Sequence, residues 1–330
     1  MVKIKWGILS TARIGQKQLI PAIQRSVNGE VEAIASRGEK AKEVASKFNI
    51  PKAYTSYEDL LNDDDIDAVY IPLPNSLHKQ WVVEAAKHKK HVLCEKPAAL
   101  HTNELKEMLT ECRENGVYFM EAFMYQFHPQ HEKVKQVIAS GVIGDVSLMK
   151  GSFSFVLEND PTNIRLNKDL GGGSLFDVGC YCIHSIRSIL DQEPVRVFAS
   201  AKLSDTGVDT TAIGMLDMEN GVKAVFDSSF ELSARSMYEI VGSKGTIKVP
   251  QAYRPDNNNH IGVVQVIKDD GTVEEIEVHG DQYKNQVEHF AACILENKEP
   301  QYTDDKMLNN LKVIEACYQS IEQNASIELQ

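Results

Sequence analysis

The chain contains 330 residues, with a hydrophobic fraction of 42% and a formal net charge of −12. This length provides for roughly two domains of ordinary globular composition, each with a sizeable core. The acidic charge disfavours a long nucleic-acid footprint or an anionic membrane surface as a partner, and no stretch approaches the ~20 apolar residues of a membrane span.

The first part of the chain alternates apolar strands with amphipathic helices. Strands are expected at Ile4–Leu9, Val31–Ser36, Asp67–Leu73, His91–Glu95 and Val117–Phe123. Helices are expected at Ile14–Val27, Glu39–Phe48, Leu77–Lys87 and Asn103–Asn115. The strands are continuous apolar runs, as in a parallel sheet that is covered on both faces. The pattern therefore predicts a doubly wound α/β domain, a dinucleotide-binding Rossmann domain over residues 1–123.

After His128-Pro129 the pattern becomes rich in strands. A helix, His131–Ser140, precedes strands at Val146–Val156, Val195–Ala201, Thr210–Met218, Val222–Phe230, Ser236–Val241, Thr246–Val249 and Val263–Lys268, and the helices Tyr283–Glu296 and Asp304–Asn324 close the chain. Turn signals such as Glu219-Asn220-Gly221 favour antiparallel hairpins. We therefore expect a second, α+β domain over residues 124–330, with a large, mostly antiparallel open sheet that binds substrate and forms a dimer.

The six cysteines lie inside apolar segments, without the spacing of zinc sites or the density of a disulfide scaffold. We expect buried free thiols. The apolar run in the opening MVKIKWGILS is too short for a signal peptide. Together these features favour a cytoplasmic protein.

The first strand leads into a loop that resembles a phosphate-binding turn. Ser10, Ala12 and Gly15 occupy the small positions of the G-x-G-x-x-G pattern, which needs small residues so that the backbone can approach a pyrophosphate. The following helix start offers unpaired amides to the phosphates. We expect cofactor contacts from Ser10, Thr11, Ala12, Arg13 and Ile14. The alternative is that this is an ordinary tight turn between a strand and a helix.

The end of the second strand indicates which dinucleotide binds. An NAD enzyme places an acidic residue there for the ribose 2′-hydroxyl. This chain has Ser36-Arg37, with Lys40 in the following turn, and these groups attract a 2′-phosphate that a carboxylate would repel. The alternative is that Arg37 is a solvated surface charge. We predict NADP as the cofactor, with NAD as the alternative.

Three ordered motifs resemble one known family. Glu95-Lys96-Pro97 at the end of a strand, the run at 72–78 (PLPNSLH), and Arg165 upstream of 171–181 (GGGSLFDVGCY) are similar to motifs of the glucose–fructose oxidoreductase/inositol dehydrogenase (Gfo/Idh/MocA) family. The resemblance spans nearly the whole chain and implies an NAD(P)-dependent oxidoreductase. It further implies cofactor contacts from Leu73, Pro74, Asn75, His78, Glu95, Lys96 and Arg165.

Asp177, Tyr181 and His184 are spaced so that they share one face of a helix. A helix cap, a core aromatic and a core histidine would explain them without a site, but a polar stripe in an apolar segment favours one. The family's motif aspartate corresponds to Asp177, and its second polar residue to Tyr181. A tyrosine there resembles glucose–fructose oxidoreductase, NADP-dependent xylose and glucose dehydrogenases and dimeric dihydrodiol dehydrogenase. Gln126 and Ile164 depart from that subgroup, which has Arg and Trp there.

The expected chemistry is hydride transfer between nicotinamide C4 and a secondary alcohol or hemiacetal carbon. Tyr181 would act as general base, Lys96 would lower the pKa of that tyrosine, and Asp177 would orient the substrate hydroxyl or Lys96. Substrate contacts are expected from Lys96, Phe123, Asp177, Tyr181 and His184. No metal is expected, because the run His128-Pro129-Gln130-His131-Glu132 has no further ligand set.

Three functions agree with these residues. An NADP-dependent dehydrogenase of sugars or cyclic polyols, with oxidation of an aldose at C1 favoured, is the first. The second is trans-dihydrodiol or dicarbonyl oxidoreduction, and the third is a dinucleotide sensor without turnover. Retention of Lys96, Asp177 and Tyr181 together argues against the sensor. An open sheet face also predicts a homodimer or a dimer of dimers.

Overall fold

The structure is a computed structural model that describes residues 2–158 and 163–329. Its backbone contacts divide the chain into two compact units. The first unit consists of Met1–Met124 and Tyr283–Leu308, and the second of Tyr125–Gln282 and Asn309–Gln330. The chain thus leaves the first unit near the predicted boundary, but it returns to that unit before its last helix. The roles predicted for residues 1–123 and 124–330 stay predictions.

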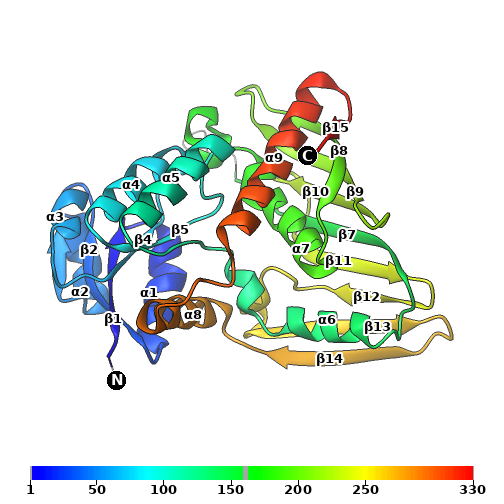
Figure 1. Ribbon diagram of the computed structural model, residues 1–330, viewed down its shortest axis with the longest axis horizontal. Coiled ribbons are helices and arrows are strands. Elements are labelled where there is room, and N and C mark those ends of the chain that lie inside the picture. Colours follow the sequence, from blue (N-terminus) through cyan, green and yellow to red (C-terminus); the bar gives the residue numbers. More distant parts are fainter. Residues whose placement is uncertain (1, 159–162, 330) are drawn as a thin grey trace. The chain divides into compact units, whose positions relative to one another are not determined.

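The sheet of the first unit contains six parallel strands among the described residues, in the order β3-β2-β1-β4-β5-β6 (Figure 1). The strands are β1 Ile4–Leu9, β2 Gly29–Ala35, β3 Lys52–Tyr54, β4 Ala68–Ile71, β5 His91–Cys94 and β6 Phe119–Glu121. The helices are η1 Gly15–Leu19, α1 Ile20–Arg25, α2 Lys40–Phe48, α3 Tyr57–Leu61, η2 Asn75–Leu77, α4 His78–Lys87, α5 Thr102–Glu114 and α8 Gln282–Glu296. The predicted doubly wound parallel fold is confirmed.

The core of this unit lies on the central strands, whose apolar side chains are buried on both faces. Ile8 and Leu9 of β1 and Val69 of β4 are 0% exposed, as continuous apolar strands require. Trp6 is likewise 0% exposed, and its ring lies 5.9 Å from that of Phe290 on α8. The returning segment therefore completes the core of the first unit.

The sheet of the second unit contains nine strands among the residues described, in the order β14-β13-β12-β11-β7-β10-β9-β8-β15. They are β7 Val146–Ser154, β8 Pro194–Leu203, β9 Asp209–Met218, β10 Lys223–Ser229, β11 Arg235–Gly242, β12 Gly245–Val249, β13 Ile261–Lys268, β14 Val273–His279 and β15 Ile327–Glu328. The helices and short turns are η3 Met124–Phe127, α6 Gln130–Ala139, η4 Ile164–Leu166, η5 Lys168–Leu170, η6 Leu175–Gly179, α7 Cys180–Leu190, η7 Pro255–Asn258 and α9 Asp304–Gln323. Among the strands that the structure describes, only β7 and β10 pair in parallel, so the predicted mostly antiparallel sheet is confirmed.

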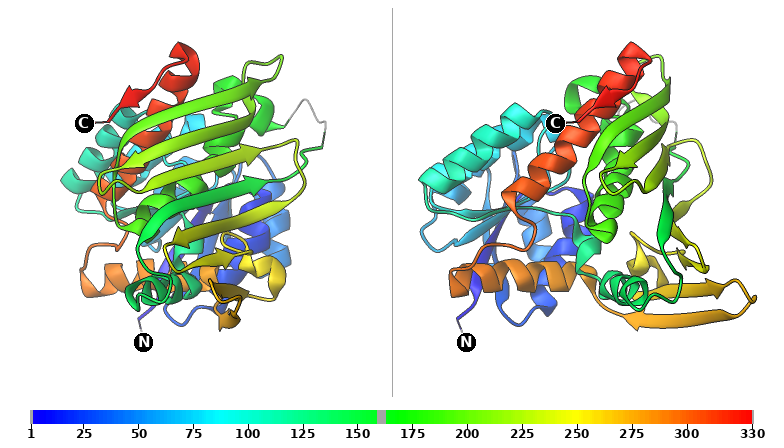
Figure 2. Two further views of the ribbon diagram at one scale, coloured as in Figure 1. Left: turned by 90° about the vertical axis from the view of Figure 1, so that its right-hand side faces the viewer. Right: turned by 45° about the vertical axis from the view of Figure 1, so that its right-hand side comes forward.

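One face of this sheet packs against α7, and Figure 2 shows the strands in front of their helices. Along β9, Ala212 and Leu216 are 0% exposed, whereas Ile213 and Met215 on the other face are 57% and 53% exposed. This alternation is the period of two that a half-covered strand requires. The second face is therefore open in the isolated chain.

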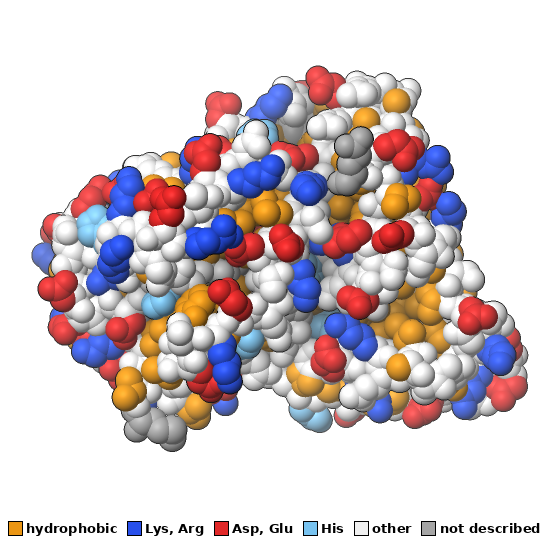
Figure 3. Space-filling view, viewed as in Figure 1, with side chains coloured by type: hydrophobic (Ala, Val, Ile, Leu, Met, Phe, Trp, Pro, Cys, Tyr) orange, Lys and Arg blue, Asp and Glu red, His pale blue; other side chains and the backbone are white. Residues whose placement is uncertain are grey.

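All six cysteines are free and buried, as predicted. Acidic and basic side chains are interspersed over the face in Figure 3, without a continuous patch of one sign there. None of the helices described is long and apolar enough to cross a membrane.

Candidate active site

The loop after β1 has a conformation that glycine usually adopts. Ser10 has a φ of +143°, in a region that residues with a side chain rarely occupy. Its hydroxyl accepts a hydrogen bond from the Ala12 amide at 3.0 Å, so the serine side chain helps to close the turn. The π-helix η1 begins at Gly15, directly after Ile14. Strained backbone and π-helical turns both concentrate at functional sites.

A basic pocket of about 580 Å³ lies at this loop. Its lining residues, as far as the structure describes them, include four cationic side chains and no acidic one. They are Ser10, Thr11, Ala12, Arg13, Gln16, Lys17, Lys40 and Lys47. The sequence prediction missed Gln16, Lys17 and Lys47, although Lys47 follows Lys40 two turns along α2 and shares its face. The pocket is suited to a phosphate-bearing ligand.

Ser36 and Arg37 follow β2, where the 2′-phosphate was predicted to bind. Ser36 is 6% exposed, and among the residues that the structure describes its hydroxyl has no hydrogen-bond partner. Arg37 is exposed. Burial raises the pKa of Tyr57, and the nearby Arg37 and a hydrogen bond with Ser10 oppose that rise. Tyr57 thus connects Arg37 to the phosphate loop. An unsatisfied hydroxyl beside an arginine fits the 2′-phosphate of NADP.

Lys96 lies in the turn after β5, and a buried histidine binds the backbone of this turn. His78 is 0% exposed, and its ring nitrogens contact the Pro97 carbonyl at 3.0 Å and the Leu73 carbonyl at 2.9 Å. Burial lowers the pKa of His78, so the ring is neutral near pH 7 and donates to one of them. His78 therefore connects the Lys96 turn to the loop after β4. Its predicted place beside the nicotinamide stays a prediction.

The other cofactor and substrate residues predicted in this unit lie close to that turn in the sequence. Pro74 and Asn75 follow β4 and are partly exposed. Glu95 accepts a hydrogen bond from the buried Tyr70 hydroxyl. Phe123 is 0% exposed and packs edge-on against Tyr302, with 5.9 Å between ring centres. Contacts from these residues to a ligand stay predictions.

In the second unit, Asp177 forms an ion pair with Arg165. The Arg165 Nε donates to Asp177 Oδ2 at 2.6 Å, and the Asp177 carboxylate is the main reason that the pKa of Arg165 is raised. Asp177 lies in the π-helix η6, where its amide donates to the Gly173 carbonyl at 3.0 Å. Arg165 was predicted to contact the cofactor, and the structure adds that it holds Asp177 in place. A fixed carboxylate of this kind can orient a hydroxyl group.

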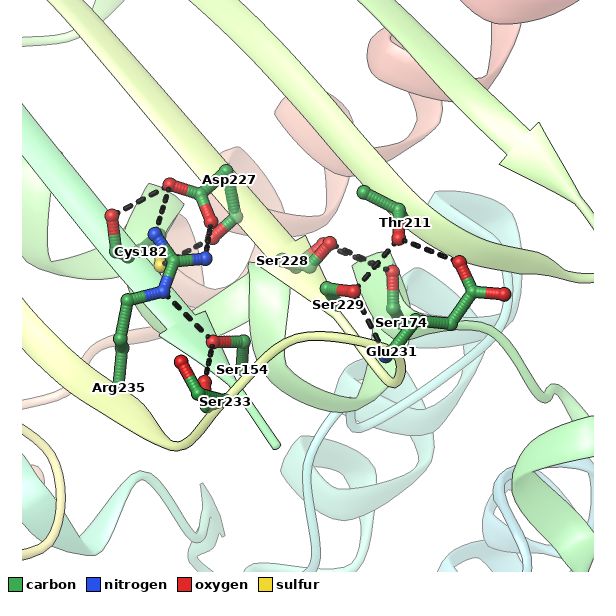
Figure 4. Close-up of polar contacts among 11 residues, drawn as sticks. Ser154, Ser174, Cys182, Thr211, Asp227, Ser228, Ser229, Glu231, Ser233 and Arg235 are labelled. Carbon is green, nitrogen blue, oxygen red and sulfur yellow. Dashed lines mark hydrogen bonds and ion pairs between the residues drawn. The ribbon is translucent and has the colours of Figure 1, made fainter. Parts of the chain in front are cut away.

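The start of η6 is anchored to the sheet through Ser174 and Asp209. Ser174 Oγ donates to Asp209 Oδ2 at 2.8 Å. It also contacts Ser228 Oγ at 3.1 Å (Figure 4). Asp209 Oδ2 also accepts the Leu175 amide at 2.7 Å. A Cβ on Gly173, which has a φ of +121°, would lie 2.3 Å from Asp209 Oδ1. The predicted glycine run thus approaches protein groups closely in this structure.

Tyr181 is 5% exposed and lies among aromatic rings. The ring centres of Phe153, Tyr125 and Tyr253 are 5.3, 5.6 and 5.7 Å from its own. His184, one turn further along α7, shares a hydrogen bond with the Tyr125 hydroxyl. Lys96 belongs to the first unit, and Asp177, Tyr181 and His184 belong to the second.

The histidines near the start of α6 are bound to protein groups. His128 contacts the His260 carbonyl at 3.2 Å, and His131 contacts the Tyr238 hydroxyl at 2.9 Å. Within residues 2–158 and 163–329, no group of three or more His, Cys, Asp or Glu could hold a metal ion.

The parallel sheet, the loop after β1 and the basic pocket are features expected of a dinucleotide-binding domain. A family model described as "Oxidoreductase family, NAD-binding Rossmann fold" matches residues 4–123, and one described as "GFO/IDH/MocA C-terminal domain" matches residues 131–248. The chain belongs to the Gfo/Idh/MocA oxidoreductase family. The predicted family, enzyme class and nicotinamide dinucleotide cofactor are confirmed.

Similar proteins cover most of the chain. D-xylose 1-dehydrogenase (NADP(+)) 2 from Haloferax volcanii is 40% identical over 98% of this chain and 99% of its own length. Trans-1,2-dihydrobenzene-1,2-diol dehydrogenase from Xenopus laevis is 36% identical over 74% of this chain and 75% of its own. A 3-ketoreductase from Actinomadura kijaniata, solved with NADP and TDP-benzene, is 30% identical with a TM-score of 0.91, over 96% and 98% of the two chains.

Proposed function

We propose that the chain is an NADP-dependent oxidoreductase that transfers a hydride between nicotinamide and a sugar or cyclic polyol, with oxidation of an aldose at C1 favoured. The observation that carries this proposal is Tyr181, which lies in an aromatic cluster one turn after an aspartate held by Arg165. The similarity to D-xylose 1-dehydrogenase over almost the whole chain supports an aldose as the substrate.

The basic pocket and the residues after β2 support NADP as the cofactor. Lys40 and Lys47 line the pocket, and Ser36 has a buried hydroxyl that a phosphate oxygen could satisfy. Arg37 supplies the charge that an NAD-specific site replaces with a carboxylate. Two of the similar proteins are described with NADP, which agrees with this assignment.

In the proposed mechanism each predicted residue has one role. When bound, NADP accepts or supplies the hydride at its nicotinamide ring. Tyr181 takes the proton of the substrate hydroxyl as general base in the oxidative direction. Lys96 lowers the pKa of that tyrosine because an ammonium group favours the phenolate. Asp177, fixed by Arg165, orients the hydroxyl that loses its proton.

A trans-dihydrodiol is the second candidate substrate. The aromatic rings of Tyr125, Phe153 and Tyr253 lie around Tyr181 and would offer apolar contacts to the ring carbons of a dihydrodiol. The similarity to trans-1,2-dihydrobenzene-1,2-diol dehydrogenase supports the same possibility over a smaller part of the chain.

A substrate panel followed by NADPH absorbance tests these proposals. Aldoses, cyclic polyols and trans-dihydrodiols are each offered with NADP⁺ and with NAD⁺. We expect turnover of aldoses with NADP⁺ at the lowest substrate concentrations. Binding of NADPH without turnover of any of the three classes would favour the sensor instead.

The open sheet face of the second unit supports a homodimer or a dimer of dimers. Its apolar side chains lie beside charges that are already paired within the face. Asp217 pairs with Arg196 and Lys223, and Arg235 pairs with Asp227 (Figure 4). Covering charges that are already paired costs less desolvation free energy than covering isolated charges.

A cytoplasmic location is also proposed, because the six cysteines are free thiols.

A further inference from the structure

The buried carboxyl group of Glu121 lies beside the turn that carries Lys96. Glu121 is the last residue of β6, pairs in register with Cys94 of β5, and is 4% exposed. Its Oε1 accepts a hydrogen bond from the Ala98 amide at 2.7 Å. The backbone on the carboxyl-terminal side of Lys96 is therefore held by two buried side chains, since His78 contacts Pro97.

The groups around this carboxyl come from three segments of the first unit. Glu95 and Lys96 lie in the turn, Cys94 ends β5, and Tyr302 belongs to the segment before α9. Burial and the Glu95 charge raise the pKa of Glu121, whereas the Ala98 amide, the Tyr302 hydroxyl and the Lys96 ammonium lower it. The result is a pKa of about 7.

A hydrogen bond to Ala98 does not by itself require a carboxyl group. A glutamine oxygen would accept the same amide proton without the cost of burying a charge. The carboxyl group differs from that amide in its negative charge above pH 7, and that charge acts on Lys96. The difference between Glu and Gln at this position is therefore electrostatic.

We infer that Glu121 is a positioning residue for Lys96: its carboxylate holds the turn at Ala98 and favours the ammonium form of Lys96. The inference deepens the proposed function, in which Lys96 acts on Tyr181. Above pH 7 the ionised Glu121 stabilises the Lys96 ammonium group electrostatically. Below pH 7 Glu121 is protonated and this effect is lost, while the hydrogen bond to Ala98 remains available through the unprotonated oxygen.

The test measures Lys96 directly in the full-length protein without cofactor. Acetic anhydride acylates only the unprotonated amine, and peptide mass spectrometry gives the rate of Lys96 acylation at each pH, with the exposed Lys106 as internal reference. Glu121→Gln should lower the apparent pKa of Lys96 by on the order of one unit, which raises the acylation rate by up to about tenfold below that pKa. An unchanged Lys96 profile overturns the inference.

Glu104→Gln is the matched control. Glu104 also accepts a backbone amide near this turn, from Leu100 at 3.2 Å, but it is not among the groups with the largest effect on the pKa of Glu121. Its substitution should leave the Lys96 profile unchanged. An equal shift in both variants would show a general effect of surface charge and would also overturn the inference.

A second measurement keeps the inference testable if Glu121→Gln does not fold. Infrared difference spectra of the parent should show a carboxylic-acid band that disappears as the pH rises through about 7. Tyr302→Phe removes a group that lowers the pKa of Glu121, so the band should persist to higher pH. The absence of such a band in both proteins overturns the inference. Failure of the proposed function would instead appear as full turnover in Lys96→Ala. That outcome would not affect the acylation rates measured for the parent protein and Glu121→Gln.

Discussion

Tyr181 provides the sharpest test at the scale of single residues. Tyr181→Phe keeps the ring and its packing against Phe153 and Tyr253 but removes the hydroxyl. Turnover should fall by a factor on the order of 10²–10⁴, the usual contribution of general acid–base catalysis. NADPH affinity, measured by fluorescence titration, should stay the same because the phosphate loop belongs to the other unit.

Tyr238→Phe is the control for this experiment, since it removes a different buried hydroxyl from the same unit, one that contacts His131. Tyr238→Phe should retain turnover.

The effects of Lys96→Ala and Tyr181→Phe on turnover should not add if the two residues act as a unit. Full activity in Tyr181→Phe would show that Tyr181 is not the general base, and His184 would become the next candidate for that role.

Arg37 decides the choice of cofactor in our proposal. Arg37→Asp places a carboxylate where NADP carries its 2′-phosphate, so it should weaken NADP(H) binding on the order of 10- to 100-fold and erase or invert the preference over NAD(H). Lys106→Asp makes the same charge change at an exposed position on α5 and should leave the ratio of the two affinities unchanged. Equal affinities of the parent protein for NADPH and NADH would refute the assignment.

At the scale of elements, the π-helix η6 depends on Gly173. An alanine Cβ there would lie 2.3 Å from Asp209 Oδ1, and the φ of +121° adds backbone strain. Gly173→Ala should therefore lower the free energy of unfolding by more than about 2 kcal/mol, because steric and conformational costs combine. Urea unfolding followed by fluorescence measures this loss.

Gly141→Ala is a control from the same unit. Gly141 has a φ of +73°, but a Cβ there would meet nothing within 4 Å. Its substitution should cost only the conformational strain, about 1–2 kcal/mol. Equal losses of unfolding free energy in the two variants would contradict the expected clash between an alanine Cβ at position 173 and Asp209.

The sequence predicted the long elements and missed those with a different local pattern. β14 was missed because Glu274, Glu275 and Glu277 break the apolar alternation, as charged residues often do on an edge strand. β3, Lys52–Tyr54, is too short to show a period. Both π-helices form i→i+5 hydrogen bonds, which a search for a period of 3.6 reads as ordinary helix.

The candidate site shows the same limit. Lys96, Asp177 and Tyr181 belong to motifs, so the sequence alone could name them as candidates. The ion pair between Arg165 and Asp177 could not be predicted, because it depends on how an irregular loop folds back. Glu121 was read as part of an apolar strand, and only its burial and its bond to Ala98 reveal its place beside Lys96.

At the scale of the whole molecule, the open sheet predicts the assembly. Met215 of β9 pairs in register with Phe198 of β8 and Val225 of β10, so apolar side chains continue across neighbouring strands. A second copy of the chain that covers this face would bury them. Met215→Glu should at least halve the mass measured by light scattering at micromolar concentration.

Leu295→Glu is the control for the assembly. Leu295 is 42% exposed on α8 in the first unit, and a glutamate there should leave the mass unchanged. A parent protein that is already monomeric at micromolar concentration would contradict the proposed dimer.

The return of the chain to its first unit has a consequence for biosynthesis. Trp6 emerges from the ribosome well before its partner Phe290, which follows much later in the sequence. Until α8 emerges, the nascent Rossmann sheet lacks this partner for the Trp6 indole. The N-terminal unit therefore cannot finish folding ahead of the rest of the chain, and during synthesis it presents the kind of exposed apolar surface that chaperones bind.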